Sequence, residues 1–63
     1  MSDPNVNPNL EALAGTLLLG GLEIQPTNVE AANTLFENAA EVYEEAGLPS
    51  EASDARDFIL PTE

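Results

Sequence analysis

Apolar residues return every three or four positions in three successive segments of the chain, which is the spacing of one face of a helix. The first segment covers about residues 8–20 and begins after Asn7-Pro8. Asparagine caps helix starts and proline fits the first turn, so Asn7 is a candidate cap and Asn9 is the alternative. Gly20-Gly21 is expected to end this helix, because glycine accepts the left-handed backbone conformation of helix ends. The apolar positions of the segment are Leu10, Leu13, Ala14, Leu17 and Leu18.

The second segment covers about residues 28–46 and has the clearest start signal in the sequence. Thr27 and Glu30 have the spacing of a capping box, in which each side chain bonds the backbone N–H of the other residue. Gly47 is expected to form the C-terminal cap. At about 100° per residue, the apolar and the acidic residues of this segment fall on opposite sides of the helix. The apolar positions are Ala32, Leu35, Phe36, Ala39, Ala40, Tyr43 and Ala46.

The third segment covers about residues 49–60. Pro49 suits the first turn of a helix, and Pro61 is expected to stop it. Residues 22–25, between the first two segments, could be extended chain or a last turn of the first helix. The apolar positions of the third segment are Ala52, Ala55, Phe58 and Ile59.

Strand-type alternation of useful length is absent from the sequence, so the fold class is predicted to be all-α. We expect a compact three-helix domain over residues 9–63. Residues 1–8 contain two prolines and two asparagines and are expected to form a flexible leader. A hydrophobic fraction of 43% in a well-patterned chain favours this folded domain over disorder.

A bulky aromatic, two small residues, a tyrosine and a turn glycine stand at fixed offsets in the second and third segments. They are Phe36, Ala40, Ala52, Tyr43 and Gly47. The same kinds of residue recur at these offsets in the tetratricopeptide repeat, so residues 36–59 resemble one degenerate repeat of that family. The resemblance implies a closely packed helical hairpin with the first helix over its open face, and it favours protein binding.

The chain departs from the family pattern at three positions. Ala39 replaces the usual leucine, Arg56 stands where a large apolar residue is expected, and Ile59 where a small one is. Since stable arrays need about three repeats, a solenoid is not expected. An ordinary antiparallel helix pair, without any relation to the family, explains the same pattern.

The net charge is −11, from twelve acidic residues and the single base Arg56. This charge argues against direct binding to nucleic acid or to an anionic membrane, because both need Lys and Arg to neutralise phosphate. It is compatible with a protein partner that has a basic surface, and equally with hydration in concentrated salt. Arg56 has no well-placed acid on its own helix, so we expect it to reach Glu44 or Glu45 across the Gly47 turn.

Four glutamates of the second segment are the candidate partner-binding residues: Glu37, Glu41, Glu44 and Glu45. Like charges four residues apart cost about 0.2–0.5 kcal/mol each in a helix, and no lysine is interleaved to offset them. Keeping this repulsion suggests a use for the charge, such as steering a basic surface. A merely solvated face is the alternative.

Leu17, Leu18 and Leu19 cover more than one side of the first helix. One of them is expected to stay uncovered, which makes Leu17 and Leu19 candidate contacts for a partner or for a second copy of the chain. Full coverage by the other two helices is the favoured alternative.

Catalytic, cofactor-binding and metal-binding residues are not expected. The chain has no histidine, cysteine or lysine, so no base is available to activate a serine or threonine nucleophile. The glycines do not form a phosphate loop, and no loop has the Asp and Gly spacing of a calcium site. Without a basic n-region at the start or an apolar run of membrane-spanning length, the cytoplasm is the expected location.

The sequence therefore predicts a small acidic interaction module, an adaptor or inhibitor without enzyme activity, that docks on a protein partner. The first alternative is a nucleic-acid mimic, whose carboxylates imitate phosphates and block a DNA- or RNA-binding protein. The second is a salt-adapted helical protein of another role.

Overall fold

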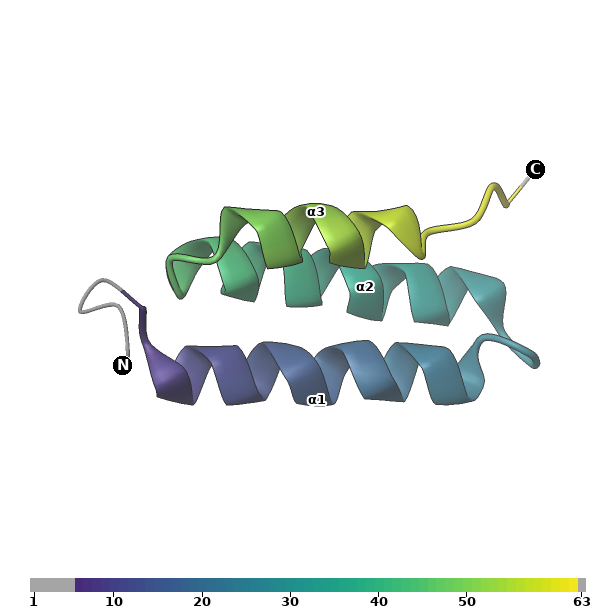
Figure 1. Cartoon of the computed structure of the whole chain (residues 1–63). Helices are drawn as coiled ribbons and strands as arrows, with labels where there is room; N and C mark the ends of the chain where they lie inside the picture. The colour runs from purple at the N-terminus through teal and green to yellow at the C-terminus, as the bar shows by residue number, and fades with distance from the viewer. Residues whose placement is uncertain (1–5, 63) are drawn as a thin grey trace.

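The structure is a computed structural model that describes residues 6–62. Three helices account for most of this range: α1 (Pro8–Ile24), α2 (Val29–Glu45) and α3 (Pro49–Asp57) (Figure 1). No strand occurs between residues 6 and 62. The predicted all-α class with three helices is confirmed. The leader predicted for residues 1–8 lies mostly outside the described residues, and Pro8 is the first residue of α1.

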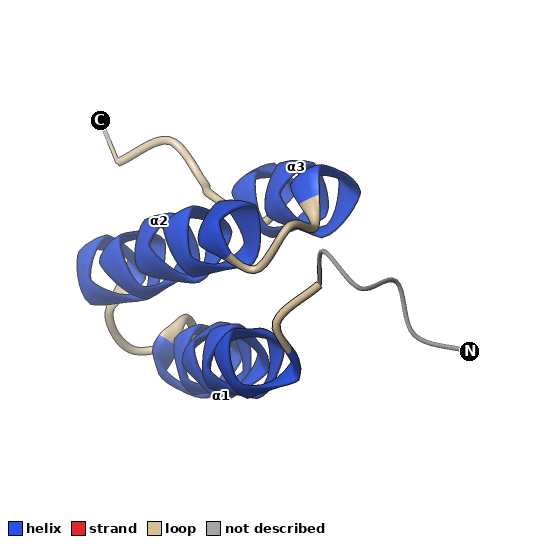
Figure 2. Cartoon of the chain, turned by 90° about the vertical axis from the view of Figure 1, so that its left-hand side faces the viewer, coloured by secondary structure: helices blue, strands red, loops and turns tan. Residues whose placement is uncertain are grey.

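The helix α2 is the centre of the molecule. Successive helices run in opposite directions, and both α1 and α3 pack against α2 (Figures 1 and 2). The first and third helices touch each other little. One link between their far ends is the side-chain amide of Gln25, which donates to the carbonyl of Phe58 at 3.3 Å. At the other end of α1, the backbone N–H of Asn7 donates to the carbonyl of Ala46, the residue that follows α2, at 2.9 Å.

The starts of α1 and α2 depend on asparagine side chains, whereas the start of α3 has no side-chain cap hydrogen bond. Asn7 Oδ1 accepts from the backbone N–H groups of Asn9 and Leu10, as the Asn7-Pro8 prediction requires. The capping box predicted for Thr27 and Glu30 is wrong. Asn28 is the cap of α2 and accepts from the N–H of Ala31 at 3.0 Å.

Thr27 serves the end of α1 instead of the start of α2. Its hydroxyl donates to the carbonyl of Ile24 at 3.1 Å, and its backbone N–H donates to the same carbonyl. Both Thr27 and Asn28 are residue types that cap helices well, so the sequence alone could not choose between them.

The prediction that Gly20-Gly21 ends the first helix is wrong, because α1 continues to Ile24. Neither glycine has a positive φ angle. A Cβ atom at Gly21 would lie 2.6 Å from Cε1 of Phe36. Gly21 therefore has a packing role: it lets the Phe36 ring lie directly against the backbone of α1.

The core consists mainly of alanine. A cluster of Ala39, Ala40, Ala52 and Ala55 is buried between α2 and α3, and Leu17, Leu18 and Tyr43 pack against it. Phe36 is the one large side chain that is completely buried in the described part of the chain. Its ring centre lies 5.5 Å from that of Phe58, in a tilted arrangement. Small residues at the helix contacts allow the helix backbones to approach closely.

The turn between α2 and α3 agrees with the prediction. Gly47 has a φ of 86°, the left-handed conformation that glycine accepts most readily. Pro49 is the first residue of α3. The predicted end of this helix at residue 60 is wrong, because α3 ends at Asp57.

The early end of α3 has a tertiary cause. Asn33 of α2 holds Leu60 in both directions: its Nδ2 donates to the Leu60 carbonyl at 2.7 Å, and its Oδ1 accepts from the Leu60 N–H at 3.0 Å. The N–H groups of Phe58 and Ile59 bond carbonyls three residues back, which tightens the last turn. The chain then leaves the helix towards Asn33.

Candidate interaction surfaces

The side of α2 that faces away from the core carries a row of exposed carboxylates. We call Glu37, Glu41, Glu44 and Glu45 the acidic face. The buried residues of α2 lie on the opposite side of the helix. Four residues of helix rise about 6 Å, so Glu37, Glu41 and Glu45 form a slowly turning row with that spacing. The structure brings together the four glutamates named from the sequence.

Arg56 lies at the edge of the acidic face. Its Nη1 donates to Oε2 of Glu44 at 2.9 Å, so the prediction of a bond across the Gly47 turn is confirmed for Glu44. The hydrogen bond to Glu44 raises the pKa of Arg56, and the charges of Glu44, Glu37 and Glu41 add to this effect. Both side chains are about half exposed, so the pair adds little stability.

The ion pair between Arg56 and Glu44 neutralises one of the four glutamates of the acidic face and, among the described residues, leaves the other three unpaired with a base. Arg56 is the only lysine or arginine in the chain, and its bond goes to Glu44. Glu37, Glu41 and Glu45 thus have no basic side chain bonded to them in residues 6–62. They are the part of the acidic face most available to a partner.

The candidate leucines of α1 separate in the structure. Leu17 is partly buried against the alanine cluster, and Leu19 is 64% exposed. The expectation that one leucine stays uncovered is confirmed for Leu19, and full coverage by α2 and α3 is wrong for this residue. Leu17 already contributes to the core, so of the two it is Leu19 that can contact a partner.

Leu13 is a surface residue that the sequence pattern missed. The pattern placed it on the buried face, but it is 48% exposed. The buried residues of α1 are Ala14 and Gly21, seven positions apart on one face. Recognising Gly21 as a packing residue, instead of a helix end, would have centred the buried face on these two positions and placed Leu13 at its edge.

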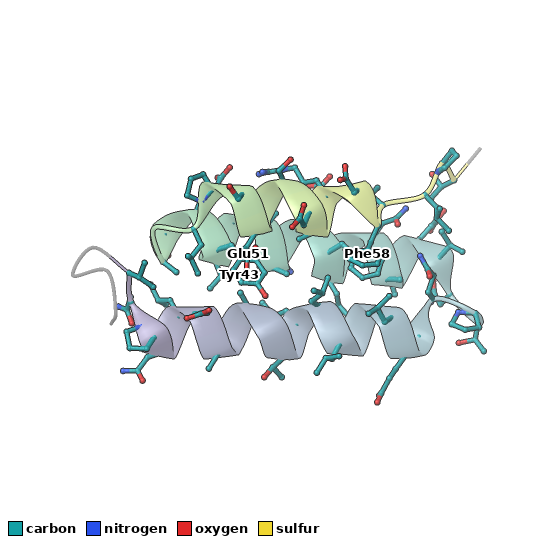
Figure 3. The ribbon with its side chains drawn as sticks, in the orientation of Figure 1. Tyr43, Glu51 and Phe58 are labelled. Atoms are coloured by element: carbon teal, nitrogen blue, oxygen red, sulfur yellow. The ribbon has the colours of Figure 1, made fainter. Side chains whose placement is uncertain are left out.

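Tyr43 joins α2 to α1. A Cβ atom at Gly15 of α1 would lie 3.8 Å from the Tyr43 hydroxyl, and Figure 3 shows Tyr43 beside Glu51, between the α1 ribbon and the α2–α3 pair. Burial raises the pKa of Tyr43, and the charges of Glu51 and Glu11 raise it further. The hydroxyl therefore stays protonated at neutral pH and does not act as a base there.

Among residues 6–62, no three acidic side chains are grouped so that they could hold a metal ion, and no pocket is present. The helices described are too short or too polar to cross a membrane. The comparison of the chain with family models, with curated proteins and with solved structures found no match.

Proposed function

We propose that the protein is a non-enzymatic interaction module, an adaptor or inhibitor, that docks on a basic surface of a protein partner through the acidic face of α2. The observation that carries the proposal is the exposed row of Glu37, Glu41 and Glu45, without a basic partner, on one rigid helix. A row fixed on a helix presents charge at a set spacing and loses little freedom on binding.

The uneven distribution of acidic residues supports binding over simple hydration. The 17 residues of α2 contain five glutamates, whereas the 17 residues of α1 contain two. A protein that used acidity only to stay hydrated in salt would gain from acids on every exposed side. Here the exposed side of α1 keeps leucines, and eight of the twelve acids lie on α2 and α3.

The experiment compares three baits at equal concentration in lysate of the source organism. The first is the native chain, and the second is the triple variant E37Q/E41Q/E45Q. The third is the control E11Q/D54N/D57N, in which exposed acids of α1 and α3 are changed. Each triple variant removes three negative charges, from −11 to −8, so the two have equal net charge.

We expect a specific protein to be captured by the native chain and the control but lost with the α2 variant. Equal capture by both triple variants would contradict the proposal, because binding would then follow net charge alone. Release of the partner by added duplex DNA would identify the protein as a nucleic-acid mimic, the first alternative. Indifference to DNA would leave the adaptor or inhibitor.

A further inference from the structure

The helix α3 lies on α2 and is attached to it by little buried surface (Figures 1 and 2). Its buried residues are Ala52 and Ala55, both in the alanine cluster. Among residues 6–62, no backbone hydrogen bond joins residues 49–62 to α1 or α2. Because two alanine side chains bury a small apolar area, α3 gains little from docking. By contrast, α1 and α2 share the enclosed ring of Phe36, which lies on Gly21.

The segment after α3 is held by side-chain amides and one aromatic contact. Gln25 donates to the Phe58 carbonyl at 3.3 Å, and Asn33 bonds both backbone groups of Leu60. The Phe58 ring, whose centre lies 5.5 Å from that of Phe36, belongs to a residue that is 39% exposed. All three hydrogen bonds are exposed to water, so each opposes separation only weakly.

A helix as short as α3 does not persist without packing. It has nine residues, and its start has no side-chain cap hydrogen bond. Isolated helices shorter than about 12–15 residues are marginal in water. The helix therefore melts when it leaves α2, so that docking and folding of this part are one step. The helices α1 and α2, with 17 residues each, still pack on each other.

The hinge and the charge both favour separation at this place. Gly47 joins α2 to α3 with a φ of 86°, and glycine accepts other backbone conformations readily. One base, Arg56, offsets the five glutamates of α2 and the three acids of α3, and charge at this density opposes compaction. We propose that residues 48–60, which we call the cover, separate from α2 as one unit while α1 and α2 stay paired.

Opening of the cover changes the acidic face. Arg56 belongs to the cover, and in the closed state its Nη1 bonds Oε2 of Glu44 at 2.9 Å. Opening therefore frees the fourth carboxylate of the acidic face. It also uncovers the α2 part of the alanine cluster, Ala39 and Ala40. The effect on a basic partner rests on the proposed function, whereas the opening itself does not and is tested without any partner.

The first test uses a single introduced cysteine, because the chain has none of its own. Ala55→Cys places a thiol on the buried side of α3, and Ala14→Cys places one on the buried side of α1. The two alanines are 1% and 0% exposed. Reaction with an excess of an aromatic disulfide reagent should label Ala55→Cys at least about tenfold faster, since only the cover must open. Equal labelling rates would overturn the proposal.

Adding Gly15→Ala to both cysteine variants separates opening of the cover from unfolding of the whole chain. Alanine stabilises α1 against unfolding, so labelling of Ala14→Cys should slow about two- to fivefold. Labelling of Ala55→Cys should keep its rate, because α1 stays helical while the cover is open. The ratio of the two rates should thus rise about two- to fivefold. An unchanged ratio would mean that α3 opens only when the whole chain unfolds.

The contact of Arg56 is tested by Glu44→Gln in the Ala55→Cys chain. Glu41→Gln is the control, because it removes the same charge from the acidic face but no bond to Arg56. Loss of the exposed ion pair should speed labelling roughly 1.5- to fivefold relative to the control. Equal labelling of the two variants would exclude a role of Arg56 in holding the cover closed.

Hydrogen exchange of the native chain tests whether the cover opens as one unit. The amides of residues 53–57 and the Leu60 amide, which donates to Asn33, should share one protection factor within about threefold. That factor should lie at least about tenfold below those of Leu18 and Ala40, in the middle of α1 and α2. Protection that falls steadily towards Leu60 would indicate fraying, and protection equal to that of α2 would indicate no separate opening. Either result would contradict the proposal.

Discussion

Single small residues decide how closely the helices approach. Gly21 has no side chain where the Phe36 ring lies on α1, and alanines fill the contact between α2 and α3. A larger residue at such a point must move a ring that is fully enclosed. The cost of that movement opposes the gain in helix propensity that alanine has over glycine.

Gly21→Ala should destabilise the protein by about 1–2 kcal/mol. Overpacking against the fixed Phe36 ring costs about 1–3 kcal/mol, and the better helix propensity of alanine returns up to about 1 kcal/mol. Urea unfolding followed by circular dichroism measures the change. Gly15→Ala is the control: its Cβ would lie at an ordinary 3.8 Å from the Tyr43 hydroxyl, so it should stabilise by about 0.5–1 kcal/mol. If both substitutions stabilise the protein, the close contact between Gly21 and the Phe36 ring does not limit the size of the residue at position 21.

Tyr43 gives the fold a dependence on alkaline pH. Its pKa is raised in the folded chain, by burial first and then by Glu51 and Glu11. The folded state therefore holds the phenol proton more tightly than the unfolded state. That contribution is complete below the ordinary value near 10 and is lost as the pH rises through the folded pKa. Unfolding free energy should fall above about pH 10 in the native chain, and less steeply in Tyr43→Phe. Identical alkaline slopes in the two proteins would rule out this role.

At the scale of helices, local signals determined the starts and tertiary contacts determined the ends. The sequence predicted the starts at Pro8 and Pro49 and the reversal at Gly47, where one residue type fixes the backbone. It placed the ends of α1 and α3 wrongly. Those ends depend on contacts between residues far apart in the chain, which no local pattern contains.

The candidate interaction surfaces, like the helix bounds, were predicted only in part from the sequence. A periodic pattern is enough to place glutamates on one exposed side of α2, so the acidic face could be named in advance. The exposure of Leu13 could not, because it depends on which side of α1 packs on α2. That side is set by the contact of Gly21 with Phe36.

Asn33→Ala should release the segment that follows α3. The substitution removes both hydrogen bonds to Leu60, each worth about 0.5–1.5 kcal/mol, and we expect a loss of about 1–2 kcal/mol because the bonds are exposed. Hydrogen exchange should speed up at the Leu60 amide, which donates to Asn33. The control Asn38→Ala, at an exposed position of the same helix, should change stability by less than about 0.5 kcal/mol. If the exchange rate of the Leu60 amide is unchanged in Asn33→Ala, the two hydrogen bonds between Asn33 and Leu60 do not form in solution.

At the scale of the whole molecule, charge and apolar surface are separated. The acidic face lies on the outer side of α2, and the exposed leucines Leu13 and Leu19 lie on α1, which packs against the opposite side of α2. We propose the acidic face as the surface that binds a basic partner.

The central claim is that binding depends on the position of the carboxylates on α2. The most direct test is calorimetric titration of the captured partner with the native chain and the two triple variants of equal charge. We predict that E37Q/E41Q/E45Q raises the Kd roughly tenfold or more, whereas E11Q/D54N/D57N raises it less than about threefold. Equal Kd values for the two variants would contradict the claim, because the acidic face would then contribute only its charge.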